Sequence, residues 1–216
     1  PLGLNNSLYS MGHIAMQIMS NAQGFLFVAA GSVVGKVSGL ANVAITGFAS
    51  GATTFAAQNK GAGNYARLKK GSHNIALFSA AITAVLCITV TIFSPFILGW
   101  FTDDTAVLEL AILRLLQTLP FMWIYTIFAT IMNYLNGMGV IRYTTIINIL
   151  TLWAVRIPCA YIIARYINGY YIGIASTLSF IFGMTSMLLY YVFSPNWKEV
   201  KRLAAASPDK SKELTA

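Results

Sequence analysis

The sequence predicts an all-α polytopic membrane protein, built as a six-transmembrane-helix bundle. Three observations lead to this prediction. Of the 216 residues, 57% are hydrophobic and only 9% are charged, whereas a soluble domain carries about 25% charged residues. Six apolar stretches approach the ~20 residues that a helix needs to cross a bilayer. Most of the basic residues gather between these stretches or after the last of them, as they do in membrane proteins.

The predicted spans occupy most of the chain, and residues 1–194 are expected to form one bundle. The first span is the weakest by hydropathy, whereas the third contains no charged residue. Pro95, Pro120 and Pro158 are expected to kink their helices, because proline removes a backbone hydrogen bond. The six spans cover about residues 4–24, 25–57, 74–101, 105–135, 143–167 and 170–193.

The charged residues between the spans predict how the chain is oriented. The connection Lys60–Lys70, the connection around Arg142 and the tail from Trp197 onward are basic. The intervening connections, Phe101–Thr105 and Ile167–Tyr171, are acidic or neutral. This alternation predicts a multi-pass membrane protein with both termini in the cytoplasm.

The net charge of +8 arises from these basic segments and not from a solvated basic face. We therefore expect the lipid bilayer, and not nucleic acid, as a partner. The tail, residues 195–216, is predicted to lie at the membrane interface with Trp197 as an anchor, and then to be disordered over residues 207–216. The chain begins without an initiator methionine or a basic signal segment, so we expect it to be part of a longer polypeptide.

Four polar side chains recur in the first span at intervals of three, four and four residues. They are Ser10, His13, Gln17 and Asn21. This spacing places them on one face of a helix and predicts the wall of a water-filled cavity, since polar groups are costly in hydrocarbon. The alternative is hydrogen bonding to a neighbouring helix, worth about 1 kcal/mol per bond. A proton-linked role for His13, whose reference pKa is ~6.5, is less favoured than a simple hydrogen bond.

Three further polar residues are candidates for the same cavity. Lys36 in the second span either faces the cavity or extends to the outer headgroups. Asn148 lies in the fifth span. Arg156, near the middle of that span, requires an acceptor, such as a carbonyl freed by Pro158. In the fourth span, Arg114 is expected to pair with Glu109.

The second span carries glycines at four-residue spacing. Such spacing places glycines on one face of a helix and predicts close packing against another helix. These glycines are Gly31, Gly35, Gly39, Gly47 and Gly51.

No motif in the sequence predicts an enzyme. The chain has no phosphate-binding glycine loop, no metal-ligand spacing and no nucleophile motif, so neither a metal nor a cofactor is expected. The two cysteines, Cys87 and Cys159, lie in apolar runs and are expected to be buried. Transport, or contacts between helices, are the remaining classes of function.

At the end of the second span the sequence reads Gln58-Asn59-Lys60-Gly61-Ala62-Gly63-Asn64, followed by Arg67. This run resembles the inner end of helix eight in the multidrug and toxic compound extrusion (MATE) transporters. Further segments resemble the same family in the same order, over about residues 2–193. They are Ile97–Phe101 with Asp104, Leu119–Phe121, Asn136–Gly139, Arg156–Tyr161, and Gly169 with Gly173.

The resemblance implies the C-terminal half of such a transporter, helices seven to twelve, which is one lobe of a twelve-helix protein. It implies an antiporter of the plasma membrane, the inner membrane of a bacterium, that exports cationic or amphipathic drugs in exchange for H⁺ or Na⁺. Its expected partner is a missing N-terminal lobe, fused or separate. Acidic positions of some members align with His13, Gln17 and Phe121, so the ion-coupling site is not located in this half. Two alternatives stay open: a flippase for lipid-linked saccharides of the same superfamily, and a non-transporting six-helix scaffold subunit.

Overall fold

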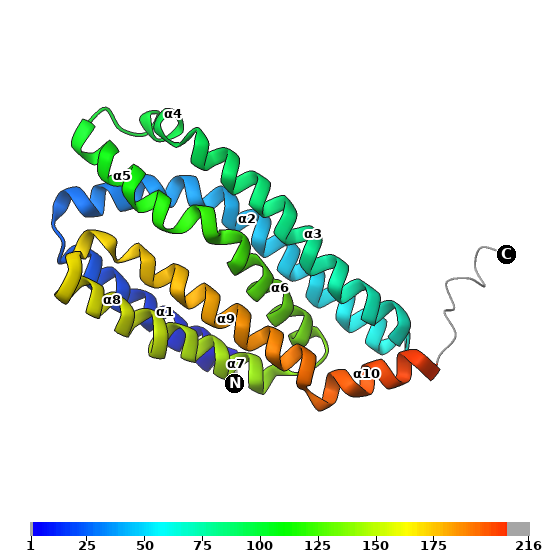
Figure 1. The fold of residues 1–216 in the computed structure, drawn as a ribbon. Coiled ribbons are helices and arrows are strands. Elements are labelled where there is room, and N and C mark those ends of the chain that lie inside the picture. Colours follow the sequence, from blue (N-terminus) through cyan, green and yellow to red (C-terminus); the bar gives the residue numbers. More distant parts are fainter. Residues whose placement is uncertain (1, 207–216) are drawn as a thin grey trace.

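The computed structural model describes the backbone of residues 2–206 and the side chains of residues 7–206. Over this range the chain folds into helices that lie side by side in an elongated bundle (Figure 1). In η2 and η3 the backbone is π-helical, and η1 and η4 are single 3₁₀ turns. In chain order the elements are α1 (Leu2–Asn21), α2 (Phe25–Gly61), α3 (Tyr65–Ile92), α4 (Ser94–Gly99), α5 (Thr105–Thr118), η1 (Leu119–Phe121), α6 (Met122–Gly137), α7 (Ile141–Leu150), η2 (Thr151–Arg156), α8 (Ile157–Ile163), η3 (Ala164–Asn168), η4 (Gly169–Tyr171), α9 (Gly173–Phe193) and α10 (Pro195–Ala206).

Five helical stretches of the described chain are long and apolar enough to cross a membrane. They are Phe25–Gly61, Tyr65–Ile92, Thr105–Gly137, Ile141–Tyr171 and Gly173–Phe193. The helix α1, the weakest predicted span, is not among them, but it packs against α7, η2 and α8 as a further helix of the bundle. The predicted fold class, an all-α polytopic membrane protein, is confirmed.

The third predicted span differs from the structure at both ends. Instead of residues 74–101, α3 covers Tyr65–Ile92. It begins early because Oδ1 of Asn64 accepts a hydrogen bond from the backbone N–H of Arg67 at 3.1 Å, and a cap of this kind stabilises a helix by about 1 kcal/mol. The cations Lys69 and Lys70 therefore lie within the first turns of α3 and not in a loop. The other predicted spans lie within a few residues of the corresponding helices.

The regular α-helix ends or changes its hydrogen-bond pattern at each of the three prolines that were expected to kink their helices. Pro95 lies in the first turn of α4, directly after α3 has ended. Pro120 lies in η1, the turn between α5 and α6, and Pro158 lies in the first turn of α8, directly after η2. Because proline has no N–H, the regular helical hydrogen bond cannot form at these positions.

Three apolar clusters hold the described bundle together, and one of them lies between α8 and α9 around Ala160 and Ala175. In one half, α2, α3 and α5 share a core that includes Cys87 and Leu115. In the other half, α2, α6 and α9 pack around Phe128 and Leu135. The helix α9 lies between α6 and the α7–α8 pair (Figure 1). Cys87 is buried as predicted, whereas Cys159 is only half-buried.

The helices α2 and α6 approach each other closely where α6 ends. A Cβ added to Gly137 would lie 2.3 Å from the carbonyl oxygen of Thr53 and 2.9 Å from Cβ of Ala56. The hydroxyl of Thr53 donates to the carbonyl of Asn133 at 3.1 Å. A glycine at position 137 is therefore what allows this contact between two backbones.

The basic connections lie at one end of the bundle, where the α2–α3 turn, the α6–α7 turn and α10 meet (Figure 1). The α1–α2 turn, the segment after α4 and the turn η4 lie at the opposite end. The alternation seen along the sequence is thus a separation in space between the two ends. We call them the basic end and the opposite end.

The tail begins with a helix, α10, but the expected role of Trp197 as a membrane anchor is wrong. Its side chain is only 3% exposed, and its ring lies 4.1 Å from the ring of Tyr191 and 6.5 Å from that of Tyr134, between centroids. Trp197 therefore fastens α10 to the bundle, because these tyrosines offer it an apolar site. The disorder predicted for residues 207–216 concerns residues outside the described range.

Candidate functional site

The four polar side chains of α1 that were expected to line a cavity are exposed on the surface of this bundle. They are Ser10, His13, Gln17 and Asn21. Nε2 of Gln17 donates to Oδ1 of Asn21 at 2.8 Å, and the ring of His13 meets the ring of Tyr9 edge to face, 4.7 Å between centroids. Both contacts are between residues of α1, so this polar face remains accessible to water, to a solute or to another protein surface. A neighbouring strip of α1 is apolar and also exposed, with Met11, Ile14 and Ile18.

The glycines of α2 do not mediate helix packing within this bundle, except at Gly31. There an added Cβ would lie 2.7 Å from Nη1 of Arg114. At the other four positions an added Cβ would meet no heavy atom within 4 Å; they are Gly35, Gly39, Gly47 and Gly51. The spacing correctly places these glycines near one another on α2, but that side of the helix points away from the bundle core. Within the described residues, close packing is therefore seen at Gly31, and for the other four glycines it stays a prediction.

The exposed side of α2 is richer in small and polar residues than the exposed side of α3. On α2 it carries Ser32, Asn42, Thr46, Ser50, Thr54 and Gln58 beside the glycines, together with Leu40 and Val43. On α3 it carries Leu77, Phe78, Ile82, Val85, Ile88 and Ile92. Lipid suits the α3 surface, whereas exposed amides and hydroxyls at membrane depth belong beside water or another protein surface.

Arg156 is buried, with 8% of its surface exposed. Its Nε donates to Oγ of Ser179 on α9 at 2.9 Å, and its guanidinium lies 5.2 Å from the centroid of the Phe180 ring. The acceptor is therefore a hydroxyl of the neighbouring helix, and not the carbonyl freed by Pro158 that was expected. Arg156 ends the π-helical segment η2, and such segments often occur at functional sites.

The helix α1 is docked on this π-helical segment. A Cβ added to Gly12 would lie 2.3 Å from Cδ2 of Leu152, so the two helices are in close contact. Nε1 of Trp153 donates to the backbone carbonyl of Leu8 at 3.1 Å. The docking fixes the position of the α1 polar face relative to η2.

Residues from three elements come together around Arg156. Its guanidinium lies near the Phe180 ring of α9, and the rings of Phe180 and of Tyr125 on α6 lie 4.9 Å apart between centroids. We call Tyr125, Arg156, Ser179 and Phe180 the Arg156 cluster. Of these four, the sequence predicted only Arg156 as a site residue, because the other three are on different helices and share no spacing with it.

Lys36 and Asn148 have different surroundings. Lys36 is exposed, and its Nζ lies 5.3 Å from the centroid of the Phe101 ring, at the opposite end of the bundle. Of the two interpretations of Lys36, this contact favours extension toward the outer headgroups over a position facing the cavity. Asn148 is half-buried in α7.

Arg114 does not pair with Glu109. Its Nη1 donates to the backbone carbonyl of Phe27 at 2.9 Å, and its guanidinium lies 4.0 Å from the centroid of the Phe27 ring. Glu109 is exposed on α5. Two residues that are five positions apart do not face each other on a regular helix, so the expected pair was wrong.

The segment with the MATE-like motif forms the turn between α2 and α3. Gly63 has a φ of 67°, a left-handed conformation that glycine adopts without strain. Nδ2 of the buried Asn59 donates to the carbonyl one turn earlier at 2.8 Å, and the guanidinium of Arg67 lies 5.8 Å from the centroid of the Phe55 ring. These contacts shape the turn. The remaining motif residues, Gln58 and Gly61, are exposed.

The carboxylates of the described chain lie near the two ends of the bundle. They are Asp103, Asp104 and Glu109 at the opposite end and Glu199 at the basic end. Within the described range, no three His, Cys, Asp or Glu side chains gather as they would around a metal ion. The polar faces of α1 and α2 therefore offer uncharged oxygen and nitrogen atoms as ligands.

Comparisons with known proteins show a consistent relationship. The profile of the MatE family matches residues 1–162. The probable multidrug resistance protein YoeA of Bacillus subtilis (strain 168) is 27% identical over 202 residues, which are 92% of this chain and 43% of YoeA. The Vibrio cholerae MATE transporter VcmN in its bent form has a TM-score of 0.81 at 16% identity, over 93% of this chain and 44% of VcmN. The eukaryotic MATE transporter AtDTX14 has a TM-score of 0.71 at 19% identity, over 91% of this chain and 44% of AtDTX14.

The chain thus spans less than half the length of each of these relatives. The structural likeness shows that its fold is that of one half of a MATE transporter. Together with the profile match over three quarters of the sequence, this likeness shows that the chain belongs to the MatE family of transporters.

Proposed function

We propose that this chain is the C-terminal lobe of a secondary antiporter that exports cationic or amphipathic compounds in exchange for H⁺ or Na⁺. The observation that carries the proposal is the exposed polar side of α1 and α2 on a bundle whose α3 surface is apolar. Two lobes that face each other across such a surface form a central path, and rocking of one lobe against the other opens it to either side of the membrane.

In this proposal, the α1 face contributes neutral polar ligands to the transported compound. Ser10, His13, Gln17 and Asn21 supply hydroxyl, imidazole and amide groups that can bind a solute through hydrogen bonds. The positive charge of the compound requires a carboxylate, and the carboxylates described here lie near the ends of the bundle. We therefore assign the coupling carboxylate to the N-terminal lobe. We assign no chemical reaction to this chain.

Arg156 has a positioning role in this proposal. Its hydrogen bond to Ser179 joins η2 to α9. The hydrogen bond from Trp153 to the carbonyl of Leu8 joins η2 to α1. A movement of α9 is thereby passed to the α1 face. Asn148 of α7 remains a proposed member of the same path, whereas Lys36 of α2 lies near Phe101 and extends toward the outer headgroups.

The topology is proposed from the charge distribution. The basic end of the bundle lies in the cytoplasm, with both termini on that side, in a bacterial inner membrane. This orientation places the α2–α3 turn inside and Phe101 outside.

The two other functions have less support. A flippase for anionic lipid-linked saccharides requires several cations along its path, whereas this lobe offers Lys36 beside an aromatic ring and Arg156 buried against α9. A non-transporting scaffold could use the glycine side of α2 as a contact surface, but it does not require the polar face of α1. Loss of transport on changing that face separates the scaffold from the antiporter.

The double variant His13→Ala with Gln17→Ala is expected to lower the export rate of a cationic dye about tenfold. Two hydrogen bonds to the solute are lost, each worth about 0.5–1.5 kcal/mol, while both side chains are exposed and contribute little to packing. Dye efflux and the amount of protein in the membrane are measured together. The matched control is His73→Ala, an exposed histidine of α3, which should export normally. Unchanged efflux in the double variant would remove the α1 face from the path.

A further inference from the structure

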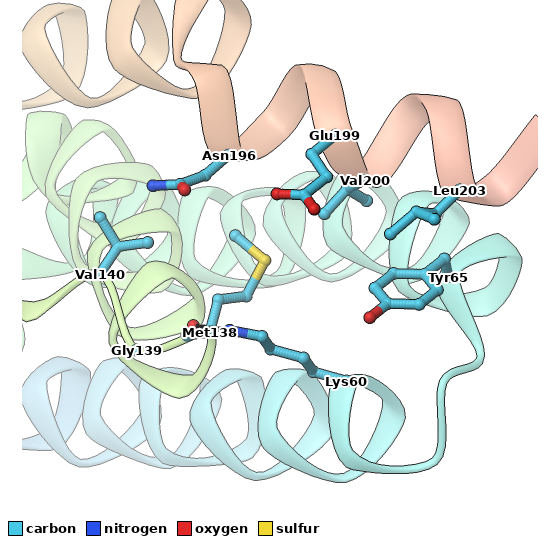
Figure 2. A pocket seen from close by; sticks show the side chains of 9 residues that line it. All are labelled: Lys60, Tyr65, Met138, Gly139, Val140, Asn196, Glu199, Val200 and Leu203. Atoms are coloured by element: carbon cyan, nitrogen blue, oxygen red, sulfur yellow. Dashed lines mark hydrogen bonds between the residues drawn. The ribbon is translucent and has the colours of Figure 1, made fainter.

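A pocket lies at the basic end of the bundle, between α10 and the two turns that precede α3 and α7. It encloses about 380 Å³, a volume in the range of small-ligand sites. Figure 2 shows side chains from three separate parts of the chain around it: Lys60 and Tyr65, Met138 to Val140, and Glu199 with its neighbours on α10. The export path proposed above uses none of these residues.

The pocket contains one positive and one negative side chain that approach it from different walls. Lys60 extends from the end of α2, and its Nζ donates to the backbone carbonyl of Met138 at 2.5 Å. A lysine ammonium has three donors, so two remain for a ligand. Glu199 extends from α10 toward the same space (Figure 2). Among the described residues that line the pocket, Lys60 and Glu199 are not joined by a hydrogen bond. The two charges are therefore available to a ligand that carries both signs.

Neutral groups complete the lining. The phenol of Tyr65 lines the same pocket as Lys60 (Figure 2) and can donate to an anion. Nδ2 of Asn196 donates to the hydroxyl of Tyr190 at 3.1 Å, which leaves its Oδ1 as an acceptor. Val200 and Leu203 of α10 and Val140 provide apolar contacts. Polar and apolar walls in one pocket suit the junction between a headgroup and its glycerol backbone.

The place of the pocket in the fold matches the depth of lipid headgroups. It lies at the ends of α2 and α6, where the apolar spans stop. The side of α10 that carries Trp197 and Val200 is buried against the bundle, while Lys198, Lys201 and Arg202 are exposed. Exposed cations of this kind attract a lipid surface. A headgroup can therefore reach the pocket from the adjacent leaflet.

We propose that this pocket binds the headgroup of a zwitterionic phospholipid with a primary amine, as in phosphatidylethanolamine. The phosphate lies against Lys60 and Tyr65, and the ammonium donates to the carboxylate of Glu199 and to Oδ1 of Asn196. Phosphatidylglycerol would place the same phosphate against Lys60, but its neutral glycerol offers no cation to the carboxylate of Glu199. A choline headgroup has no N–H to donate. The bound lipid joins α10 to the α2–α3 turn, and this role does not depend on the transported compound.

The test is a lipid-binding measurement on the delipidated native protein in detergent. Native mass spectrometry follows the titration with phosphatidylethanolamine, phosphatidylcholine and phosphatidylglycerol of identical acyl chains. The wild type should bind the ethanolamine lipid about tenfold more tightly than either of the others. Glu199→Gln should lower its affinity to that for the choline lipid, and Lys60→Met should weaken binding of the ethanolamine and choline lipids alike.

Matched controls separate the pocket from general charge effects. Lys201→Met and Glu109→Gln change exposed charges outside the pocket and should keep the preference. Circular dichroism shows whether each variant is folded, and Glu199→Gln preserves shape, so the selectivity test stands even if Lys60→Met is unstable. Equal affinity of the wild type for the three lipids, or an unchanged preference in folded Glu199→Gln, would overturn the proposal. Tighter binding of phosphatidylglycerol would indicate only attraction to the basic surface and would overturn it as well.

Discussion

Replacing Gly137 by alanine should destabilise the protein by about 2–3 kcal/mol, the upper part of the range for overpacked sites. The added Cβ would lie 2.3 Å from the carbonyl oxygen of Thr53. A backbone oxygen in the middle of α2 cannot rotate away as a flexible side chain can. The helices α2 and α6 would have to separate, which would also strain the hydrogen bond from Thr53 to Asn133. Thermal unfolding in detergent measures the effect, with a Tm lowered by roughly 4–12 °C.

The control for this variant is another glycine-to-alanine change on the partner helix. Gly51 lies in α2 with no heavy atom within 4 Å of an added Cβ. There alanine should stabilise the helix by about 0.5–1 kcal/mol, because it lowers the backbone entropy lost on folding. The two variants are thus expected to change stability in opposite directions. A Tm for Gly137→Ala equal to that of Gly51→Ala would contradict the close contact between α2 and α6.

Replacing Arg156 by methionine should reduce dye export at least about tenfold while the protein remains folded. Methionine keeps much of the side-chain volume but removes the positive charge near the Phe180 ring and the hydrogen bond to Ser179. Ser179 still donates to the carbonyl of Ser176 at 2.7 Å, so it is not left without a partner. The expected loss of stability is therefore limited to about 1–2 kcal/mol, near that of one hydrogen bond to a charged group.

Arg156→Lys is the informative companion to this variant. Lysine restores the positive charge, but it lacks the planar guanidinium that donates to Ser179 and lies near the Phe180 ring. Export by the lysine variant should fall between that of wild type and that of the methionine variant. Measured efflux, with Tm as the check on folding, distinguishes the role of the charge from that of the geometry. Wild-type efflux in Arg156→Met would exclude a role of the Arg156 cluster in transport.

The order and type of the helices could be read from the sequence because hydrophobic length and proline act locally. An apolar stretch of sufficient length specifies a span wherever it lies, and Pro120 interrupts the α5–α6 stretch regardless of its neighbours. The start of α3 was placed too late because its first turns are basic. The cap from Asn64 is a local signal that could have located it.

Contacts between distant parts of the chain were beyond the reach of sequence patterns. Glycine spacing identifies a side of α2, but only the bundle shows that this side points outward at Gly47. Arg156 was recognised as a buried cation in need of an acceptor, yet its partner Ser179 is 23 residues away on another helix. Likewise, Trp197 has the composition of a membrane anchor, and the tyrosines of α6 and α9 that bury it are visible only in the fold.

The central claim is that the polar side of α2 faces water and not lipid. The most direct measurement is labelling of single cysteines by a membrane-impermeant thiol reagent, in a background with Cys87→Ala and Cys159→Ala. The two sites are Ser50→Cys on α2 and Leu77→Cys on the apolar side of α3, which are both exposed and similarly far along their helices from Gly63. A thiol reacts as the thiolate, which forms in water and not in hydrocarbon.

The claim predicts rapid labelling of Ser50→Cys and almost none of Leu77→Cys, with the transported dye slowing the first reaction. Labelling of Ser50→Cys that is no faster than that of Leu77→Cys would place this side of α2 in lipid or in a dry contact. That result would contradict the proposed path.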